Sequence, residues 1–208
     1  MDTSDIQAVT TLAKMVPTGG VIVDVGTLLG MSASLWCIHS EASRIICIDL
    51  WKCGRSLESF RKNNGGEISK EAFLRNVPDN RIEAIQGRSP SCVSGWWSLP
   101  VDFYWEDADH NNPWLARNIR FWSRQVKPGG IVCGHDYHLP DVIRESNALA
   151  AKWGVALNRL GTSVWWIRKP IDFLDQKPDL AQVLVETSGD HASHLTRLLR
   201  LLRSRISR

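Results

Sequence analysis

Five short runs of apolar, mostly β-branched residues alternate along the chain with stretches of helical composition. The apolar runs are residues 21–25, 44–49, 81–86, 101–105 and 131–133, and the helical stretches are residues 32–39, 67–77, 113–126 and 141–153. Parallel strands need a crossover connection, which is usually a helix, so this alternation is typical of βαβ units. The sequence therefore predicts a doubly wound α/β fold with a mostly parallel, Rossmann-like sheet.

The last part of the chain departs from this alternation. Residues 155–160 and 163–167 are strand-like runs separated by Gly161, and we expect them to form a closing antiparallel hairpin. A length of 208 residues suits one full-sized domain. We predict an α/β domain over residues 1–170 and a helical extension over residues 171–208, whose end combines a leucine stripe with arginines.

Composition narrows the classes of function. Apolar residues make up 43% and charged residues 23%, as in ordinary soluble domains. The net charge of +3 is small and does not require a nucleic-acid partner. No apolar run is long enough to cross a bilayer, and the acidic N-terminus lacks the pattern of a signal peptide. Because the five cysteines are scattered without a C-x-x-C pair, we expect a reducing, cytoplasmic location.

Polar residues and glycines follow the first two predicted strands. In open α/β sheets, ligands bind at the carboxyl ends of the strands. Glycines such as Gly26 and Gly30 let the backbone approach a ligand, between Asp24 and Ser32 at the start of a helix. Asp49 ends the second strand, where a carboxylate can accept both ribose hydroxyl hydrogens of an adenosine-containing cofactor. The G-x-G-x-x-G fingerprint of dinucleotide-binding proteins is absent.

These motifs, in this order, resemble those of class I S-adenosylmethionine-dependent methyltransferases. More narrowly, they resemble small-molecule O-methyltransferases related to catechol and macrolide-sugar methyltransferases. The resemblance covers about residues 21–169. It rests on Asp24-x-Gly26-x-x-x-Gly30-x-Ser32, Asp49, Asp107-Ala108-Asp109-His110, Lys127-Pro128-Gly129-Gly130 and Gly134-His135-Asp136-Tyr137.

The resemblance implies a methyltransferase domain over residues 1–170 with S-adenosylmethionine as its cofactor. Gly26 and its neighbours would face the methionine part, and Asp49 the ribose. The residues that follow the third strand would surround the adenine. The cofactor site expected in this way comprises Asp24, Gly26, Gly30, Ser32, Asp49, Gly87, Arg88, Ser89 and Asp107.

Metal-dependent relatives hold a divalent ion with an acid after the fourth strand and two adjacent ligands after the fifth. The resemblance implies that Asp107, His135 and Asp136 would hold such an ion, Mg²⁺ or Mn²⁺. A bound cation lowers the pKa of an acceptor hydroxyl group. His135 stands where relatives usually have an oxygen ligand, and a nitrogen ligand suits Mn²⁺, Fe²⁺ or Zn²⁺ better than Mg²⁺.

His110 lies three residues after Asp107. In the sugar O-methyltransferases that this chain resembles, a histidine in the corresponding place is the general base. An imidazole near its ordinary pKa can take a hydroxyl proton at neutral pH, whereas an isolated histidine is more often a helix cap or a core residue. We predict that His110 is the base and that the protein transfers a methyl group to a hydroxyl of a small molecule, such as a sugar or a phenol.

Three other functions stay open at this point. The first is a methyltransferase that needs no metal and acts on nitrogen or oxygen. The second is a nicotinamide-dependent oxidoreductase, which the missing dinucleotide fingerprint disfavours. The third is a non-catalytic module that binds a nucleic acid or a membrane surface through its C-terminal arginines. The oligomeric state is also open, and acceptor choice in such folds is set by variable loops, here residues 52–66.

Overall fold

The computed structural model describes residues 1–52, 62 and 67–173. The described residues up to Phe173 form one compact unit. Most of the predicted extension over residues 171–208 and most of the loop 52–66 lie outside the described residues. Among the described helices, none is both long and apolar enough to cross a membrane.

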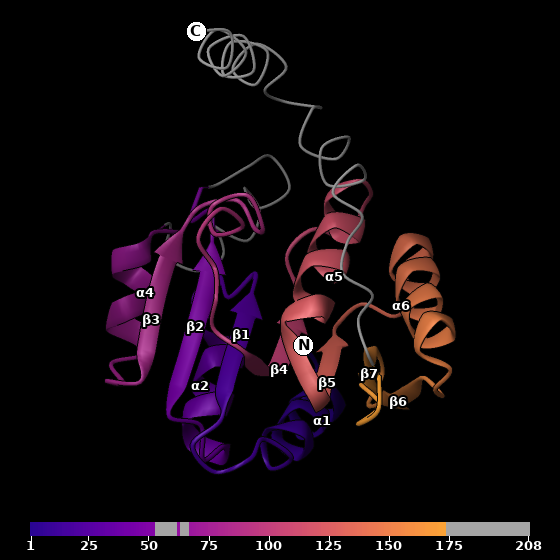
Figure 1. Ribbon diagram of the computed structural model, residues 1–208. Helices are drawn as coiled ribbons and strands as arrows, with labels where there is room; N and C mark the ends of the chain where they lie inside the picture. Colours follow the sequence, from indigo (N-terminus) through magenta and orange to yellow (C-terminus); the bar gives the residue numbers. More distant parts are fainter. Residues whose placement is uncertain (53–61, 63–66, 174–208) are drawn as a thin grey trace, which may run out of the picture. The chain divides into compact units, whose positions relative to one another are not determined.

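The strands form a single sheet in the order β3-β2-β1-β4-β5-β7-β6 (Figure 1). Strands β1 to β5 run parallel to one another, whereas β7 runs antiparallel to both β5 and β6. The predicted Rossmann-like sheet with a closing hairpin is therefore confirmed. The strands are β1 (Val21–Val25), β2 (Arg44–Asp49), β3 (Ile82–Gln86), β4 (Val101–Glu106), β5 (Val126–Gly134), β6 (Asn158–Leu160) and β7 (Val164–Arg168).

Helices cover both faces of the sheet. Of the helices that the structure describes, the first three in chain order pack with one set of buried strand residues, and the other two pack with the other set. This division follows from the alternation of strand side chains: Ile22 faces the first set of helices and Val23 the second. The helices are α1 (Thr3–Ala13), α2 (Met31–His39), α4 (Lys70–Asn76), α5 (Trp114–Gln125) and α6 (Pro140–Trp153).

Two features differ from the sequence-based prediction. Helix α1 was not predicted, although Val9 and Leu12 have helical spacing and the Asp2 side chain caps the helix by accepting a hydrogen bond from the amide N–H of Asp5. The apolar run over residues 131–133 predicts a short fifth strand, whereas β5 begins at Val126 and includes residues 127–130. Pairing with the neighbouring strand β4 shifts register there, so the strand absorbs the irregular segment.

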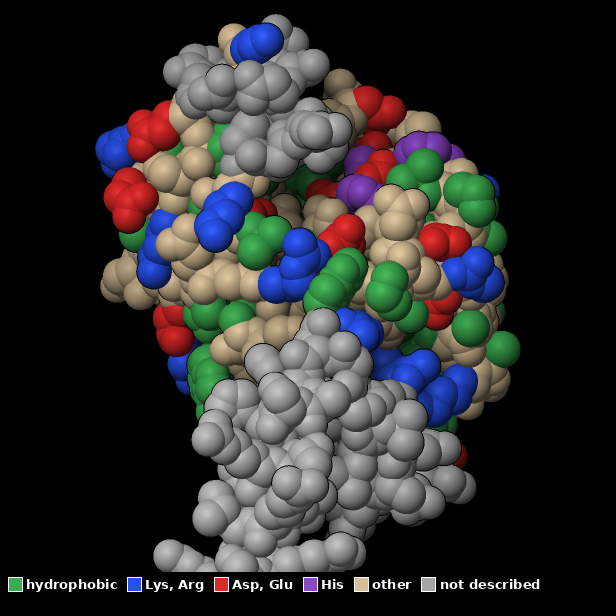
Figure 2. Space-filling model, turned by 90° about the horizontal axis from the view of Figure 1, so that it is seen from above, with side chains coloured by type: hydrophobic (Ala, Val, Ile, Leu, Met, Phe, Trp, Pro, Cys, Tyr) green, Lys and Arg blue, Asp and Glu red, His purple; other side chains and the backbone are tan. Residues whose placement is uncertain are grey.

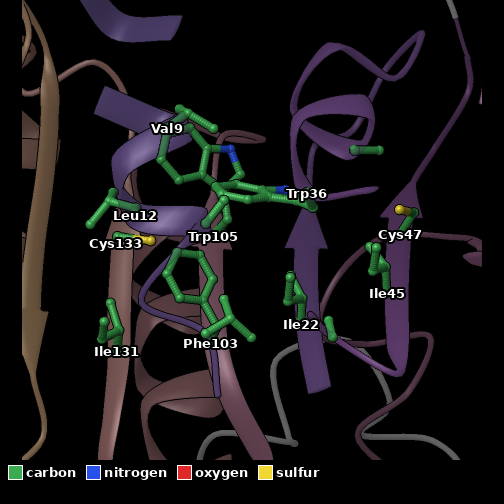
Figure 3. Packing of buried hydrophobic residues seen from close by; sticks show 14 of the residues in the cluster. Val9, Leu12, Ile22, Trp36, Ile45, Cys47, Phe103, Trp105, Ile131 and Cys133 are labelled. Carbon is green, nitrogen blue, oxygen red and sulfur yellow. The ribbon is translucent and has the colours of Figure 1, made fainter. Parts of the chain in front are cut away.

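The core beneath the first set of helices is built around aromatic rings (Figure 3). The ring centroid of Trp36 in α2 lies 5.1 Å from that of Phe103 and 5.6 Å from that of Trp105, both in β4. These three side chains are fully buried. Large aromatic rings supply much of the buried apolar area that stabilises a core, and here they hold α2 against the centre of the sheet.

Asp24 in β1 connects the sheet to α2 by polar contacts. Its carboxylate Oδ2 accepts hydrogen bonds from Ser32 Oγ (2.7 Å) and Trp36 Nε1 (2.8 Å). The second oxygen, Oδ1, has no hydrogen-bond partner in the described part of the chain. Since the side chain is fully buried, desolvation raises the pKa of Asp24 to about 7.

We predict that Asp24→Asn makes stability less dependent on pH. The pKa is raised from 3.8 to about 7 in the folded protein, so the carboxyl group's contribution to stability is complete below pH 3.8 and is lost as the pH rises through 7. Asparagine keeps an acceptor oxygen and never ionises. Measured by urea unfolding, the variant's free energy of unfolding should equal that of the wild type at about pH 4 and exceed it by about 2–4 kcal/mol at about pH 8. An unchanged pH slope in the variant would contradict this assignment.

Candidate functional site

A cavity of about 780 Å³ opens at the carboxyl ends of four neighbouring strands, β3, β2, β1 and β4. The strand order reverses between β1 and β4, which is where open α/β sheets bind ligands. Its volume is within the range of small-molecule sites. The residues that line the cavity include Gly26, Gly30, Ser32, Asp49, Gly87, Arg88, Ser89, Asp107, His110 and Asn118.

All but one of the residues predicted to bind the cofactor line this cavity. The exception is Asp24, whose carboxylate points into the core towards α2. Its neighbour Ser32 lines the cavity and holds that carboxylate in place. Asp24 therefore supports the cavity wall indirectly, from the core side, through its hydrogen bond with Ser32.

The loop after β1 depends on glycine for a reason that the sequence does not reveal. Gly26 has φ +90°, and a Cβ atom there would lie 2.2 Å from the carbonyl oxygen of Asp107. The amide N–H of Asp107 donates to the carbonyl oxygen of Val25 (2.9 Å), so the ends of β1 and β4 are in direct backbone contact. Glycine is needed because the two backbones approach so closely.

The carboxylate of Asp49 is fixed by the backbone around it. Oδ2 accepts a hydrogen bond from the amide of Leu28 (3.0 Å), and Oδ1 accepts one from the amide of Trp51 (2.7 Å). Burial raises the pKa of Asp49. Each carboxylate oxygen can accept more than one hydrogen bond, so Asp49 keeps acceptor capacity towards the cavity that it lines.

The loop after β3 forms another part of the wall. The guanidinium of Arg88 donates to Asp109 Oδ2 (2.9 Å) and lies 4.6 Å from the centre of the Trp114 ring. The hydroxyl of Ser89 accepts a hydrogen bond from Trp122 Nε1 (2.9 Å). A Cβ on Gly87 would lie 2.5 Å from that of Cys92, so this loop is also closely packed.

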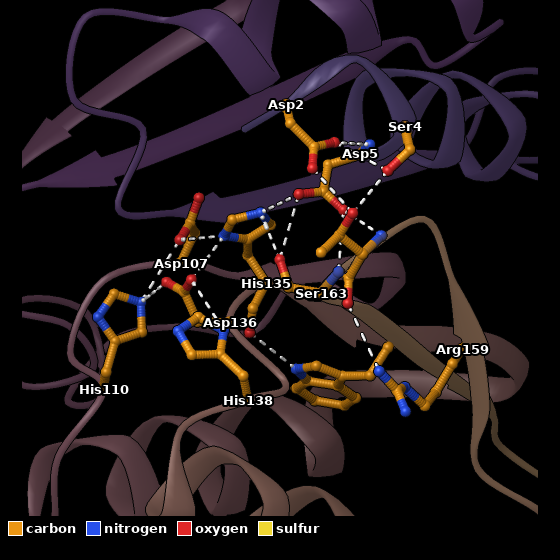
Figure 4. A network of polar contacts seen from close by, with 12 residues as sticks. Asp2, Ser4, Asp5, Asp107, His110, His135, Asp136, His138, Arg159 and Ser163 are labelled. Atoms are coloured by element: carbon orange, nitrogen blue, oxygen red, sulfur yellow. Dashed lines mark hydrogen bonds and ion pairs between the residues drawn. The ribbon is translucent and has the colours of Figure 1, made fainter.

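Histidines and aspartates gather beside the cavity, at the ends of β4 and β5 (Figures 2 and 4). His110 Nε2 lies 2.8 Å from Asp136 Oδ2 and 3.5 Å from Asp107 Oδ1. His135 Nδ1 lies 3.1 Å from Asp136 Oδ1 and 3.8 Å from Asp107 Oδ1. Four side chains from two strand ends are thus brought together, as the sequence motifs predict.

The electrostatics of this group follow from its mixture of charges. The two histidine rings beside Asp136 hold the pKa of that carboxyl group well below its usual range. The carboxylates of Asp107 and Asp136 raise the pKa of His110 to about 10. Desolvation lowers the pKa of His135, but the neighbouring carboxylates outweigh it and raise this pKa to about 9. Burial raises the pKa of Asp107. At neutral pH, His110 therefore carries its proton as long as both carboxylates are charged.

The donor atoms fit a divalent cation. Asp107, His110 and Asp136 each place one ligand atom within 4.8 Å of the others. The predicted set had His135 in place of His110, and its Nδ1 also faces both carboxylates. Two carboxylate oxygens and one or two imidazole nitrogens form a mixed oxygen and nitrogen donor set, which suits Mn²⁺, Fe²⁺ or Zn²⁺ better than Mg²⁺.

Two polar residues at or beside the site were not predicted from the sequence. Asn118 in α5 is buried, donates its Nδ2 to Glu106 Oε1 (3.3 Å) and reaches the cavity wall. Asp5 in α1 contacts His135, with 3.0 Å between Asp5 Oδ2 and His135 Nε2. The helical spacing of residues 6, 9, 12 and 13 would have revealed α1, but nothing local in the sequence pairs Asp5 with a residue 130 positions away.

Solved structures with a similar fold include several methyltransferases. The O-methyltransferase NovP matches with a TM-score of 0.61 and 16% identity, over 80% of each chain. The O-methyltransferase TomG from Streptomyces achromogenes, solved with S-adenosylmethionine, matches with a TM-score of 0.59 and 14% identity, over 81% of each chain. An O-methyltransferase from Bacillus cereus, solved with S-adenosylhomocysteine, matches with a TM-score of 0.55 and 17% identity, over 81% of this chain and 82% of that one.

The strand order and the cavity at the switch point therefore define a Rossmann-like methyltransferase fold. Residues 23–137, more than half of the chain, match the sequence model of a family described as a methyltransferase domain. The protein belongs to this family. A sequence comparison with curated proteins finds no match.

We predict that Gly26→Ala destabilises the fold itself. The added Cβ would meet the Asp107 carbonyl at 2.2 Å, so the ends of β1 and β4 must separate. Gly19→Ala is a matched control, because Gly19 also has positive φ (+75°) but has no atom within 4 Å of an added Cβ. In denaturant unfolding, the first change should cost about 3 kcal/mol or more and the second about 1–2 kcal/mol. Equal costs would show that backbone strain alone, without the close approach, makes glycine necessary.

Proposed function

We propose that the protein transfers the methyl group of S-adenosylmethionine to a hydroxyl group of a small molecule, with a divalent cation at Asp107 and Asp136. The observation that carries this proposal is a cavity at the sheet's switch point, lined by the Asp49 carboxylate and bordered by the histidine–aspartate group. Family membership supports methyl transfer. The solved O-methyltransferases of the same fold support oxygen as the accepting atom.

The lining residues fit the cofactor by chemistry. Asp49 offers carboxylate oxygens for ribose hydroxyls, and the loop from Gly26 to Ser32 brings backbone to the cavity. Arg88 and Ser89, which the resemblance assigns to the surroundings of the adenine, line the cavity, and the buried amide of Asn118 lines it too. When bound, S-adenosylmethionine supplies an electrophilic methyl group on a sulfonium centre. The chain's part is to hold the acceptor oxygen in line with that group.

The histidine–aspartate group supplies the means to activate the acceptor. A neutral alcohol is a poor nucleophile, so its proton must be removed or made more acidic. His110 can take that proton only after losing its own, because the charged Asp107 and Asp136 raise its pKa to about 10. Neutralising the two carboxylates would bring the pKa of His110 back towards its ordinary value. A divalent cation would supply this neutralisation and polarise the acceptor hydroxyl.

The cofactor assignment predicts a binding phenotype for Asp49→Ala. S-adenosylhomocysteine should bind the wild type in calorimetry, and NAD should not. Removing the carboxylate should weaken S-adenosylhomocysteine binding by about 1–3 kcal/mol, because the ribose loses its acceptor. Glu83→Ala is the control: it removes a carboxylate from β3 that pairs with Arg44 on the surface. Wild-type affinity in a folded Asp49→Ala protein would exclude Asp49 from the site, and NAD binding by the wild type would favour an oxidoreductase.

The base assignment predicts a loss of turnover in His110→Ala. Removing a general base should lower kcat about 10²–10⁴-fold, while the affinity for S-adenosylhomocysteine changes little.

The cation assignment predicts that EDTA suppresses activity and that added Mn²⁺ or Mg²⁺ restores it. The wild-type rate should rise with pH as His110 deprotonates, and the rise should move to lower pH when cation is added. Full activity in EDTA would favour a metal-independent methyltransferase, and normal turnover in His110→Ala would remove the base role.

A further inference from the structure

Asp5, near the start of α1, is buried against the histidine–aspartate group (Figure 4). Its Oδ1 accepts hydrogen bonds from the backbone amides of Thr162 (2.9 Å) and Ser163 (3.0 Å). Its Oδ2 lies 3.0 Å from His135 Nε2 and accepts a hydrogen bond from Ser163 Oγ (3.2 Å). Both oxygens are thus engaged, and the carboxylate has a fixed orientation.

The turn between β6 and β7 is shaped to fit this carboxylate. Gly161 has φ +59°, and a Cβ there would lie 2.7 Å from Asp5 Oδ1 and 2.8 Å from the carbonyl oxygen of Ser4. Only glycine allows the turn to approach α1 so closely. The approach brings the two amides that follow Gly161 onto Asp5.

His135 lies between Asp5 and the two aspartates beside the cavity. Its side chain is only 11% exposed, and its two ring nitrogens face opposite ways. Nε2 faces Asp5 and also lies 2.9 Å from Ser163 Oγ, whereas Nδ1 faces Asp136 and Asp107 at 3.1 and 3.8 Å. A carboxylate only accepts hydrogen bonds, so each ring nitrogen faces an acceptor while the site holds no cation. When a cation binds Asp107 and Asp136 and displaces the hydrogen on Nδ1, Asp5 keeps the remaining ring hydrogen on Nε2 and leaves the lone pair on Nδ1. Metal-binding histidines are commonly oriented by an outer carboxylate in this way.

We propose that Asp5 is a positioning residue that holds His135 with Nδ1 as a ligand for the cation at Asp107 and Asp136. This inference rests on the proposed function for the presence of that cation. A nitrogen ligand makes the site prefer Mn²⁺ to Mg²⁺, since Mg²⁺ gains little from nitrogen. Asp5 and Ser163 lie outside the family match over residues 23–137, so family membership by itself does not imply their contacts with His135.

Asp5→Asn tests the proposal with almost no change in shape. The side-chain carbonyl must still accept from the amides of Thr162 and Ser163, which leaves the NH₂ group facing His135 Nε2. That nitrogen must then accept a hydrogen bond, so the ring hydrogen moves to Nδ1 and occupies the ligand position. We expect Mn²⁺ affinity, measured by the EPR signal of free Mn²⁺, to fall about 10–100-fold. The preference for Mn²⁺ over Mg²⁺ should fall with it.

Asp2→Asn is the matched control. Asp2 also lies at the start of α1 and accepts a hydrogen bond from Thr162 Oγ1 (2.8 Å), but it has no contact with His135 among the described residues. The Asp2→Asn variant should alter the thermal stability of the protein without changing its affinity for Mn²⁺. If Asp5→Asn changes Mn²⁺ affinity no more than Asp2→Asn does, Asp5 only docks α1, and the proposal is wrong.

A spectroscopic measurement identifies the ligand directly. In pulsed EPR of the Mn²⁺-loaded protein, a bound imidazole nitrogen gives a ¹⁴N coupling, which should persist in His110→Gln and disappear in Asp5→Asn. Persistence in Asp5→Asn would overturn the proposal. A wild type that binds S-adenosylhomocysteine but no Mn²⁺ would also overturn it, while leaving methyl transfer intact. Failure to bind S-adenosylhomocysteine would instead count against the proposed function, whatever Mn²⁺ does.

Discussion

The contact between the carboxyl ends of β1 and β4 is the constraint on which the site depends. Gly26 lies against the carbonyl of Asp107, and the amide of Asp107 bonds to Val25. This contact sets where the loops after both strands begin. One loop carries the glycines that line the cavity, and the other carries Asp107 and His110. A small separation of the two strands would therefore displace the cavity wall and the histidine–aspartate group together.

The second constraint is electrostatic, because several buried or half-buried carboxylates lie at the same edge of the sheet. Burial raises the pKa of Asp24, Asp49 and Asp107, which means that each prefers a partner or a proton. Backbone amides hold Asp49, and hydroxyl and indole donors hold Asp24. Beside Asp107, the compensating groups are histidines, whose charge depends on what else binds there. The same side chains that stabilise the edge in the isolated protein can thus respond to a cation or a substrate.

Helix α1 and the β6–β7 hairpin, which are far apart in the sequence, meet at this group. Helix α1 precedes the sheet and the β6–β7 hairpin follows it, yet Asp5 and the amides after Gly161 are in contact. Together they enclose His135 on the side away from the cavity. The strand ends that carry Asp107 and His135 lie within the family match over residues 23–137, and the two segments that flank this match supply the surroundings of His135.

The sequence by itself determined the sheet, the order of its motifs and most of the cavity wall. These features are local: strand periodicity, glycines after strands and acids at strand ends are all visible within a few residues, and parallel pairing brings the strand ends to one edge. Only the tertiary structure showed that Asp24 faces the core, that His110 lies between two carboxylates and that Asp5 reaches His135. The direction of a side chain at a strand end depends on the backbone conformation just beyond it. The pairing of Asp5 with His135 depends on how α1 packs against the hairpin, which no local pattern encodes.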